Sequence, residues 1–261
     1  MPESLEWVDA AASFALIVLV VVISRWRQLD LERDVIWASV RAAVQLLGVG
    51  VLFSAIFASA NAMVWAWLWV LLMVLLSGWV VTRRANEVPD LWGAAIGAIA
   101  LTAAIVLAVI FGLGILDLTP VAAVVMAGIT IGNTMPSVVL GANRMLDTLR
   151  SERGQLEAML ALGSDRASST RHLEQTVIKS ALIPQIERTK VVGLIALPGA
   201  MTGLLLAGVD PIDAIVIQLA VMFLVLGSVA TSVVVVTSTI ARRALTDDLR
   251  VADWISLPRS G

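Results

Sequence analysis

Long hydrophobic stretches separated by short polar segments make up most of the chain. Such stretches match the length needed to cross a bilayer core of roughly 30 Å. We predict spanning helices at residues 7–24, 35–58, 64–82, 91–112, 120–143, 191–209 and 212–240. The pattern therefore predicts an all-α, polytopic membrane bundle of about seven transmembrane helices, with residues 1–261 as a single membrane domain.

One segment, Arg144 to Lys190, interrupts this pattern; we call it the polar segment. It carries fourteen charged residues between two nearly uncharged hydrophobic stretches. Leucines and methionines recur through its first half at helical spacing, so we predict one helix up to Gly163 and a second from about Asp165, with Ser164 as the N-cap. Pro184 is expected to break the second helix before the membrane. The polar segment is therefore predicted to form a long helical elbow outside the bilayer.

Composition agrees with a membrane protein. The chain is 59% hydrophobic and 15% charged, whereas soluble domains average about 45–50% and about 25%. It contains no cysteine, which excludes disulfides, thiolate metal sites and cysteine nucleophiles. Nucleic-acid binding is not predicted, because membrane orientation already explains the basic residues.

Charge distribution predicts the orientation. If the first span enters from outside, the inner segments are 25–34, 83–90, 144–190 and 241–261, and all 18 basic residues lie in them or within about two turns of an inner span end. The charged residues of the outer segments are all acidic: Glu3, Glu6, Asp9, Asp117, Asp210 and Asp213. We therefore expect the N-terminus outside, the C-terminus and the polar segment in the cytoplasm, and a retained first span instead of a cleaved signal peptide.

The fifth and sixth predicted spans combine glycine pairs four residues apart with proline. Small residues at this spacing allow close helix approach, and proline kinks a helix or opens a carbonyl to a cavity. We predict hinge or helix-packing roles for six residues: Gly128, Gly132, Pro136, Pro198, Gly199 and Gly203.

Polar side chains within predicted spans are costly in lipid and are expected to face the bundle interior. Together with nearby methionines they give the candidate translocation pathway: Gln45, Asn133, Thr134, Met135, Met201 and Gln218. The plainer alternatives are that Asn133 only joins two helices by a hydrogen bond and that the methionines only fill space.

The sequence EAMLALG, Glu157 to Gly163, resembles the cytoplasmic EAA loop of ABC importer permeases, whose short helix fits a groove on the ATPase subunit. Pro184 lies farther from the glycine than in that pattern. Exposed apolar residues at the tip also favour a protein partner, although a charged segment is more often only a solvated face. The predicted ATPase-coupling residues are Glu157, Met159, Leu160, Leu162, Gly163 and Arg166.

Several further motifs follow one another along about Val8 to Arg243. They are Arg41-Ala42-x-x-Gln45-Leu46, Gly132-Asn133-x-Met135, Glu157 to Gly163, Ala181-Leu182-Ile183-Pro184, Lys190-x-Val192-Gly193-Leu194, Leu197-Pro198-Gly199-x-Met201-x-Gly203 and Gly208-x-Asp210-Pro211 with Gln218. In this order the motifs resemble the FetB-type permease family, the iron-export ABC permeases and their plant aluminium-tolerance relatives.

This resemblance implies a multi-pass permease subunit of the cell inner membrane, assembled as two permeases with two separate ABC ATPases. No GxxxxGK[ST] phosphate loop occurs in the chain, so ATP and Mg²⁺ are expected in the partner and no cofactor in this chain. By resemblance the cargo is iron or another metal ion moved out of the cytoplasm. No acidic residue lies deep in a predicted span and the single histidine, His172, lies in the polar segment, so the metal ligands stay unknown.

Three alternatives remain open at this stage. The cargo is a non-metal solute such as a nucleotide sugar, or the chain is a passive channel or scaffold that never uses ATP. An intramembrane hydrolase would need a nucleophile with a base inside the bilayer. Ser137 with the distant Lys190 is the single candidate pair, which makes an enzyme the weakest of the three.

Overall fold

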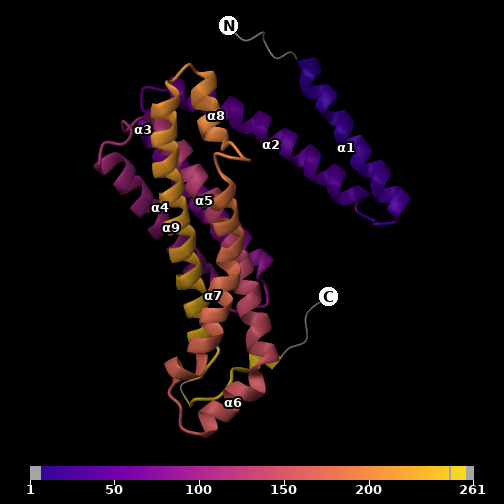
Figure 1. Cartoon of the computed structure of the whole chain (residues 1–261), viewed down its shortest axis with the longest axis vertical. Helices are drawn as coiled ribbons and strands as arrows, with labels where there is room; N and C mark the ends of the chain where they lie inside the picture. Colours follow the sequence, from indigo (N-terminus) through magenta and orange to yellow (C-terminus); the bar gives the residue numbers. More distant parts are fainter. Residues whose placement is uncertain (1–6, 247, 257–261) are drawn as a thin grey trace. The chain divides into compact units, whose positions relative to one another are not determined.

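The computed structural model describes residues 7–246 and 248–256, and side chains from Phe14 onward in these ranges up to Ile255. The acidic residues Glu3 and Glu6 used in the orientation argument lie outside the described residues. Helices follow one another along the described chain and no strand is formed there. They are α1 (Trp7–Arg27), α2 (Glu32–Ala58), α3 (Ala62–Arg84), α4 (Leu91–Gly112), α5 (Pro120–Ser151), α6 (Arg153–Ala161), α7 (Arg166–Val191), α8 (Gly199–Leu206), α9 (Pro211–Arg243) and the 3₁₀ helix η1 (Asp253–Ser256) (Figure 1).

Five of these helices are long and apolar enough to cross a membrane: α2, α3, α4, α5 and α9. They coincide with five of the predicted spans, and α1 coincides with the first. The all-helical class is therefore confirmed. The count of seven crossings and the orientation stay predictions.

The prediction of one helix over residues 191–209 is wrong. Residues Val192 to Pro198 form an irregular segment, closed by a bridge between Val192 and Ala196 and by Gly193 in a left-handed conformation, φ +86°. The following helix α8 has eight residues, about 12 Å at the helical rise, and is too short to cross a bilayer. The cause lies in Gly193 and Pro198, which favour a chain break over a continuous helix.

The expected break at Pro184 is also wrong, because α7 runs unbroken from Arg166 to Val191. Pro184 removes one backbone donor, yet Ala181 and Gln185 on either side of it are buried in a helix that packs along α5 and α9. Tertiary burial thus outweighs the local cost. Likewise α5 passes through Pro136 without interruption, and the N-cap of α7 is Asp165 instead of Ser164.

The chain divides into two compact units, residues 1–62 and 63–261. In the first, α1 and α2 pack against each other. Their connection places Gln28 and Asp30 at positive φ, and Ser24 joins its two sides, its carbonyl accepting from the amide of Leu29 at 3.0 Å and its hydroxyl from the amide of Leu31 at 3.2 Å. The first unit is a helical hairpin.

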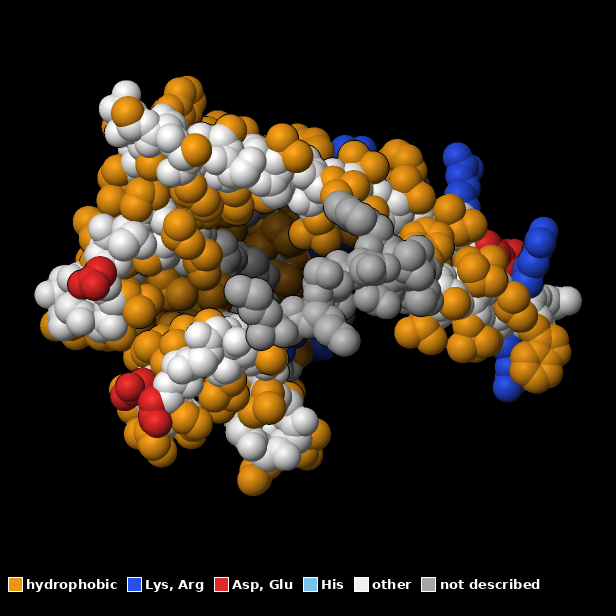
Figure 2. Space-filling view, turned by 90° about the horizontal axis from the view of Figure 1, so that it is seen from above, with side chains coloured by type: hydrophobic (Ala, Val, Ile, Leu, Met, Phe, Trp, Pro, Cys, Tyr) orange, Lys and Arg blue, Asp and Glu red, His pale blue; other side chains and the backbone are white. Residues whose placement is uncertain are grey.

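In the second unit α9 is the central helix. It packs against α4, α5, α7 and α8, while α5 also packs against α4 and α7. Close approach depends on glycine at two positions. A Cβ at Gly141 of α5 would lie 3.3 Å from Thr237 of α9, and one at Gly78 of α3 would collide with the side chain of Ile96 on α4. In the space-filling view, hydrophobic side chains cover most of the visible surface (Figure 2), as expected for helices that contact lipid.

Hydrogen bonds between helices join this second unit. The hydroxyls of Thr102 on α4 and Ser232 on α9 lie 3.1 Å apart. Ser238 of α9 donates to Glu174 of α7 at 2.7 Å. Such bonds supply directional links where hydrophobic association between helices is weak in lipid.

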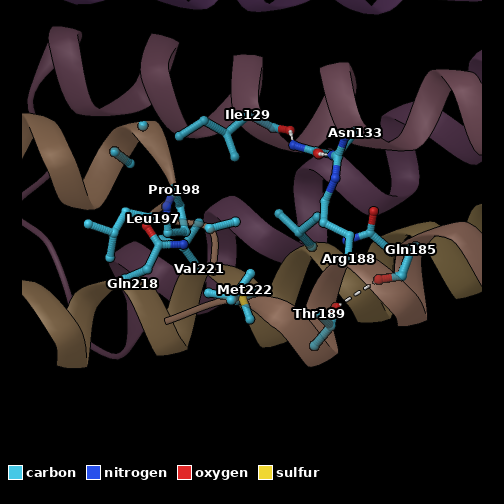
Figure 3. A pocket seen from close by; sticks show the side chains of 15 residues that line it. Ile129, Asn133, Gln185, Arg188, Thr189, Leu197, Pro198, Gln218, Val221 and Met222 are labelled. Atoms are coloured by element: carbon cyan, nitrogen blue, oxygen red, sulfur yellow. Dashed lines mark hydrogen bonds between the residues drawn. The ribbon is translucent and has the colours of Figure 1, made fainter. Parts of the chain in front are cut away.

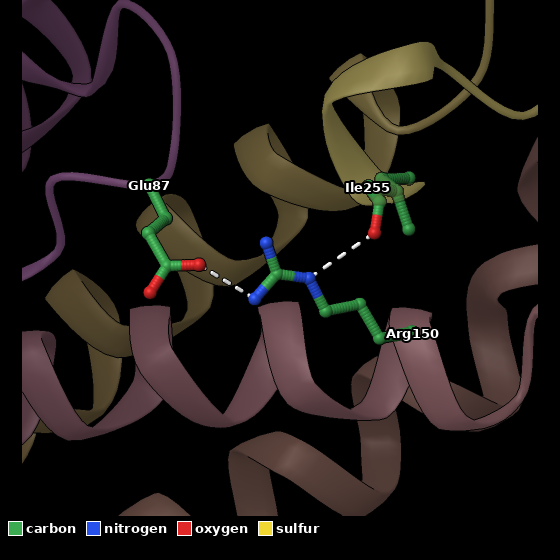
Figure 4. Close-up of polar contacts among 3 residues, drawn as sticks. All are labelled: Glu87, Arg150 and Ile255. Atoms are coloured by element: carbon green, nitrogen blue, oxygen red, sulfur yellow. Dashed lines mark hydrogen bonds and ion pairs between the residues drawn. The ribbon is translucent and has the colours of Figure 1, made fainter. Parts of the chain in front are cut away.

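Helix α6 lies at one end of the second unit (Figure 1), and polar side chains join several segments there. The guanidinium of Arg150 on α5 makes an ion pair with Glu87 at 2.6 Å, and its Nε donates to the carbonyl of Ile255 at 3.1 Å (Figure 4). Arg166 donates to the carbonyl of Thr246 at 2.6 Å. The loop after α3, the polar segment and the C-terminal segment are therefore tied together at one end.

Candidate functional site

A cavity of about 450 Å³ opens between α5, α7, α8 and α9 (Figure 3). Its walls are mostly apolar, with a few polar side chains, which is the usual composition of a small-molecule site. The polar lining comes from Asn133 of α5, Gln185, Arg188 and Thr189 of α7, and Gln218 of α9. The irregular segment closes one side through Val192, Ala196, Leu197 and Pro198.

Arg188 is the charged residue of this lining. Its guanidinium donates to Oδ1 of Asn133 at 2.8 Å, and the amide nitrogen of Asn133 donates to the carbonyl of Ile129 at 2.7 Å (Figure 3). The asparagine is thereby oriented with its oxygen toward the arginine. Because a guanidinium has five N–H donors, this one bond leaves most of its hydrogen-bonding capacity for another group.

The position of Arg188 differs from the sequence-based expectation. The polar segment was predicted to lie outside the bilayer as far as Lys190. Instead, Arg188 pairs with Asn133, which lies near the middle of the predicted fifth span 120–143. From Arg166 to Arg188 the helix α7 rises about 33 Å at about 1.5 Å per residue. The second half of α7 is therefore part of the bundle.

Gln218 lines the other part of the cavity, beside Leu197 and Pro198 (Figure 3). Its side chain is 8% exposed, and its Oε1 is fully buried without a hydrogen-bond partner in the described part of the protein. A buried, unsatisfied amide oxygen costs about 1–3 kcal/mol. Such a cost is commonly retained where a ligand or water supplies the missing donor.

The beginning of α8 also meets the cavity, through Gly199 and Ala200. The first backbone bond at this end joins the amide of Thr202 to the carbonyl of Pro198 at 3.0 Å. The amides of Gly199 and Ala200 therefore precede the first intrahelical donor, as at any helix start. The positive end of the helix dipole lies at the same wall.

Of the six predicted pathway residues, the structure brings two, Asn133 and Gln218, to this cavity. Thr134 is buried in α5 and donates to the carbonyl of Thr130 at 2.7 Å. Met135 packs at the margin of the hydrophobic core, and Met201 lies on α8 beside the lining residues. Gln45 belongs to the first unit.

Sequence reasoning missed Arg188, Gln185 and Thr189. The signal for Arg188 was present, since an arginine within one turn of a predicted span is a candidate for an intramembrane role. The sequence analysis instead places it in the polar segment, which extends to Lys190 with Pro184 as a break before the membrane. Gln185 is buried and its carbonyl accepts from the Thr189 hydroxyl at 2.9 Å.

The glycines predicted to mediate hinge or helix contacts have open surroundings. A Cβ at Gly132, Gly199 or Gly203 would meet no atom of the described chain within 4 Å, and one at Gly128 would meet only Met73 Sδ at 4.0 Å. Pro136 lies on α5, and Pro198 is the N-cap of α8. Their predicted roles in contacts or bending stay predictions.

A second candidate surface is the tip formed by α6 and the turn before α7. Leu156 is buried and Leu160 packs against the core, whereas Leu162 is 87% exposed. Gly163, at φ +85°, ends the turn, and the amide of Ser164 donates to the carbonyl of Met159 at 3.0 Å. This is the glycine-terminated helix end that the sequence suggested.

Charged groups at the tip are held in place. Glu157 pairs with Arg153 at 2.7 Å on the exposed side of α6. Hydrogen bonds from Ser168, foremost that of its hydroxyl, lower the pKa of Asp165 below its usual value of 3.8. Because the folded pKa is depressed, this stabilisation is present above pH 4 and is lost as the pH falls through the folded value.

Comparison with known proteins identifies relatives over almost the whole chain. It is 33% identical to the "Probable iron export permease protein FetB" of Escherichia coli over 229 residues, 86% of each chain. It is 33% identical to the "UPF0014 membrane protein STAR2" of rice (Oryza sativa subsp. japonica), covering 87% of this chain and 79% of that protein. The "Protein ALUMINUM SENSITIVE 3" of Arabidopsis thaliana is 31% identical, with 89% and 84% covered.

No solved structure matches the chain. The model of the uncharacterised protein family UPF0014 matches residues 7–245. These residues include both the cavity between α5, α7, α8 and α9 and the tip at α6. On these grounds the chain is a member of the UPF0014 family of multi-pass membrane proteins, which includes a probable iron export permease.

Proposed function

We propose that this protein is the permease subunit of an ATP-driven ABC exporter that moves iron or another metal ion, free or complexed, out of the cytoplasm. In this proposal a separate ATPase subunit binds ATP and Mg²⁺, and two permeases assemble with two ATPases in the plasma membrane. The name of the Escherichia coli relative supports the direction and the cargo.

One observation supports the mechanical part of this proposal. Asn133 and Arg188, which face each other in the cavity, stand on α5 and α7, and each helix continues unbroken to the tip. From Asn133 to Ser151, α5 covers about 27 Å at the helical rise. A displacement of α6 by a partner subunit would therefore shift α5 and α7 against each other at the cavity.

The exposed tip suits such a partner. Leu162 stands out at the turn between α6 and α7, while Leu156 and Leu160 beneath it fix α6 to the bundle. At 87% exposure, Leu162 is available to a partner subunit. In this proposal Leu162 contacts the ATPase, and α6, which is packed against the bundle, transmits the movement of the ATPase to the membrane helices.

Transport by inside-out vesicles tests the proposal. Vesicles containing this chain with its proposed partner ABC ATPase are expected to accumulate Fe²⁺ when ATP is supplied, and the two proteins are expected to copurify. The variant Leu162→Asp should lose both properties and keep its melting temperature, because the side chain is already exposed.

Leu118→Asp is the matched control, since Leu118 is also an exposed leucine but lies in the loop before α5, at the opposite end of that helix. It is expected to retain copurification. Fe²⁺ flux in proteoliposomes that lack any ATPase would contradict the proposal and favour a passive channel.

A further inference from the structure

The charge of the cavity restricts what it can bind. Its polar lining consists of one guanidinium, neutral amides and a hydroxyl, and none of the lining residues is acidic. Divalent metal ions prefer carboxylate or imidazole ligands, and the fixed positive charge of Arg188 repels a bare cation. The lining chemistry therefore suits an anion.

The surroundings of the cavity agree with this preference for an anion. The amides of Gly199 and Ala200 begin α8 at the cavity wall, where the helix dipole is positive. The carboxylate of Glu187, the nearest acidic residue along α7, pairs with Lys190 at 2.7 Å on an exposed surface. The guanidinium of Arg188 donates to the neutral Oδ1 of Asn133, so these neighbours do not compensate its positive charge.

Gln218 adds a separate requirement. Its buried Oε1 is an acceptor that lacks a donor among the described residues. A carboxylate or a fully ionised phosphate has no hydrogen to donate to it. A ligand that satisfies both ends of the cavity must carry a hydroxyl or N–H donor in addition to its negative charge.

We propose that the cavity lined by Asn133, Arg188 and Gln218 binds a hydroxylated organic anion, with its carboxylate or phosphate at Arg188 and a hydroxyl donating to Gln218 Oε1. This inference rests on the proposed transport function and specifies the cargo: the metal travels as a complex of such an anion, or the anion itself is carried. The guanidinium and the start of α8 hold the charge, and the apolar walls contact the rest of the ligand.

Binding to the purified full chain in lipid nanodiscs, without any ATPase, tests the inference separately from transport. The probes are citrate, tricarballylate, which is citrate without its hydroxyl, glucose 1-phosphate, and Fe²⁺ alone. Citrate is expected to raise the melting temperature and to bind, by calorimetry, more tightly than tricarballylate. Binding of glucose 1-phosphate in place of citrate would assign the anionic group to a phosphate source.

Variants locate the site. Arg188→Gln should weaken binding of the anion by about tenfold or more, since bonds to charged groups are the strong ones, and Arg188→Lys should retain part of it. Gln218→Leu should remove the difference between citrate and tricarballylate. The matched control is Arg171→Gln, an exposed arginine elsewhere on α7, which should change binding less than twofold.

Two results would overturn the inference: no binding or thermal shift with either hydroxylated anion in the wild type, or Fe²⁺ binding alone that survives or improves in Arg188→Gln. The wild-type thermal shift does not depend on any variant folding. Failure of the chain to copurify with an ATPase would count against the transport proposal and would leave this measurement unaffected.

Discussion

At the scale of single residues, two arginines of the second unit, Arg188 and Arg150, differ in their surroundings. Arg188 is exposed, lines the cavity and bonds to Asn133, whereas Arg150 is half-buried and joins Glu87 to the carbonyl of Ile255. The side chains of Arg150 and Glu87 are only 18% and 22% exposed. Screening by water is weaker for such a pair than for a surface ion pair.

The Arg150→Gln variant should therefore lower the free energy of unfolding by about 1–3 kcal/mol, since it leaves a half-buried carboxylate without its charged partner. The C-terminal segment should also be cleaved faster by trypsin at Arg250, because the bond to Ile255 is lost. Arg153→Gln is the control: the pair of Arg153 with Glu157 is about half exposed, and its loss should cost less than about 1 kcal/mol. Equal effects of the two variants would argue against this account.

At the scale of elements, the irregular segment Val192 to Pro198 separates two helices where the hydrophobic pattern predicted one. Apolar side chains there are largely exposed, Leu194 by 91%, so burial does not fix the conformation. Backbone preferences do. Gly193 occupies the left-handed region at φ +86°, and the amide of Gly193 donates to the carbonyl of Ala196 at 3.0 Å.

Gly193→Ala should consequently lower the melting temperature, corresponding to about 1–2 kcal/mol for a non-glycine residue in the left-handed region. Gly203→Ala is the matched control, because Gly203 is within α8, has no positive φ and would meet no neighbouring atom with a Cβ. It should be neutral or stabilising by up to about 1 kcal/mol. Tryptophan fluorescence during heating measures both; a neutral Gly193→Ala would show that the break is not maintained by this residue.

At the scale of the whole molecule, charge is sorted between the two ends of the second unit. The ends of α3 and α9 carry Arg83, Arg84, Arg242 and Arg243. The connections at the opposite end carry Asp117 and Asp210. This sorting supports the predicted orientation, with the α6 end in the cytoplasm.

The absence of cysteine from the sequence makes this orientation directly measurable. A single cysteine at exposed Arg171 should react with a membrane-impermeant maleimide in inside-out vesicles and be protected in right-side-out ones. A cysteine at exposed Asp117 should show the opposite pattern. Labelling of Arg171→Cys from the extracellular side would overturn both the orientation and the proposed contact with an ATPase.

Hydrophobic pattern alone determined most of the helical framework. Five predicted spans coincide with long apolar helices, and the predicted helix end at Gly163 is confirmed. The single helix predicted from Arg144 to Gly163 is wrong, because the chain breaks at Glu152 between α5 and α6. The confirmed features depend on local properties: length, apolar content and the conformational freedom of Gly163. Such properties are encoded residue by residue, so they can be read without knowledge of neighbours in space.

Only the tertiary structure decided how the polar residues are grouped. Pro184 does not end α7, because contacts with α5 and α9 bury the residues around it. The continued helix places Arg188 against Asn133, 55 residues away in sequence, and near the cavity wall that Gln218 completes from α9. Burial against distant segments outweighed a local helix-breaking preference, and no periodicity in the sequence records that balance.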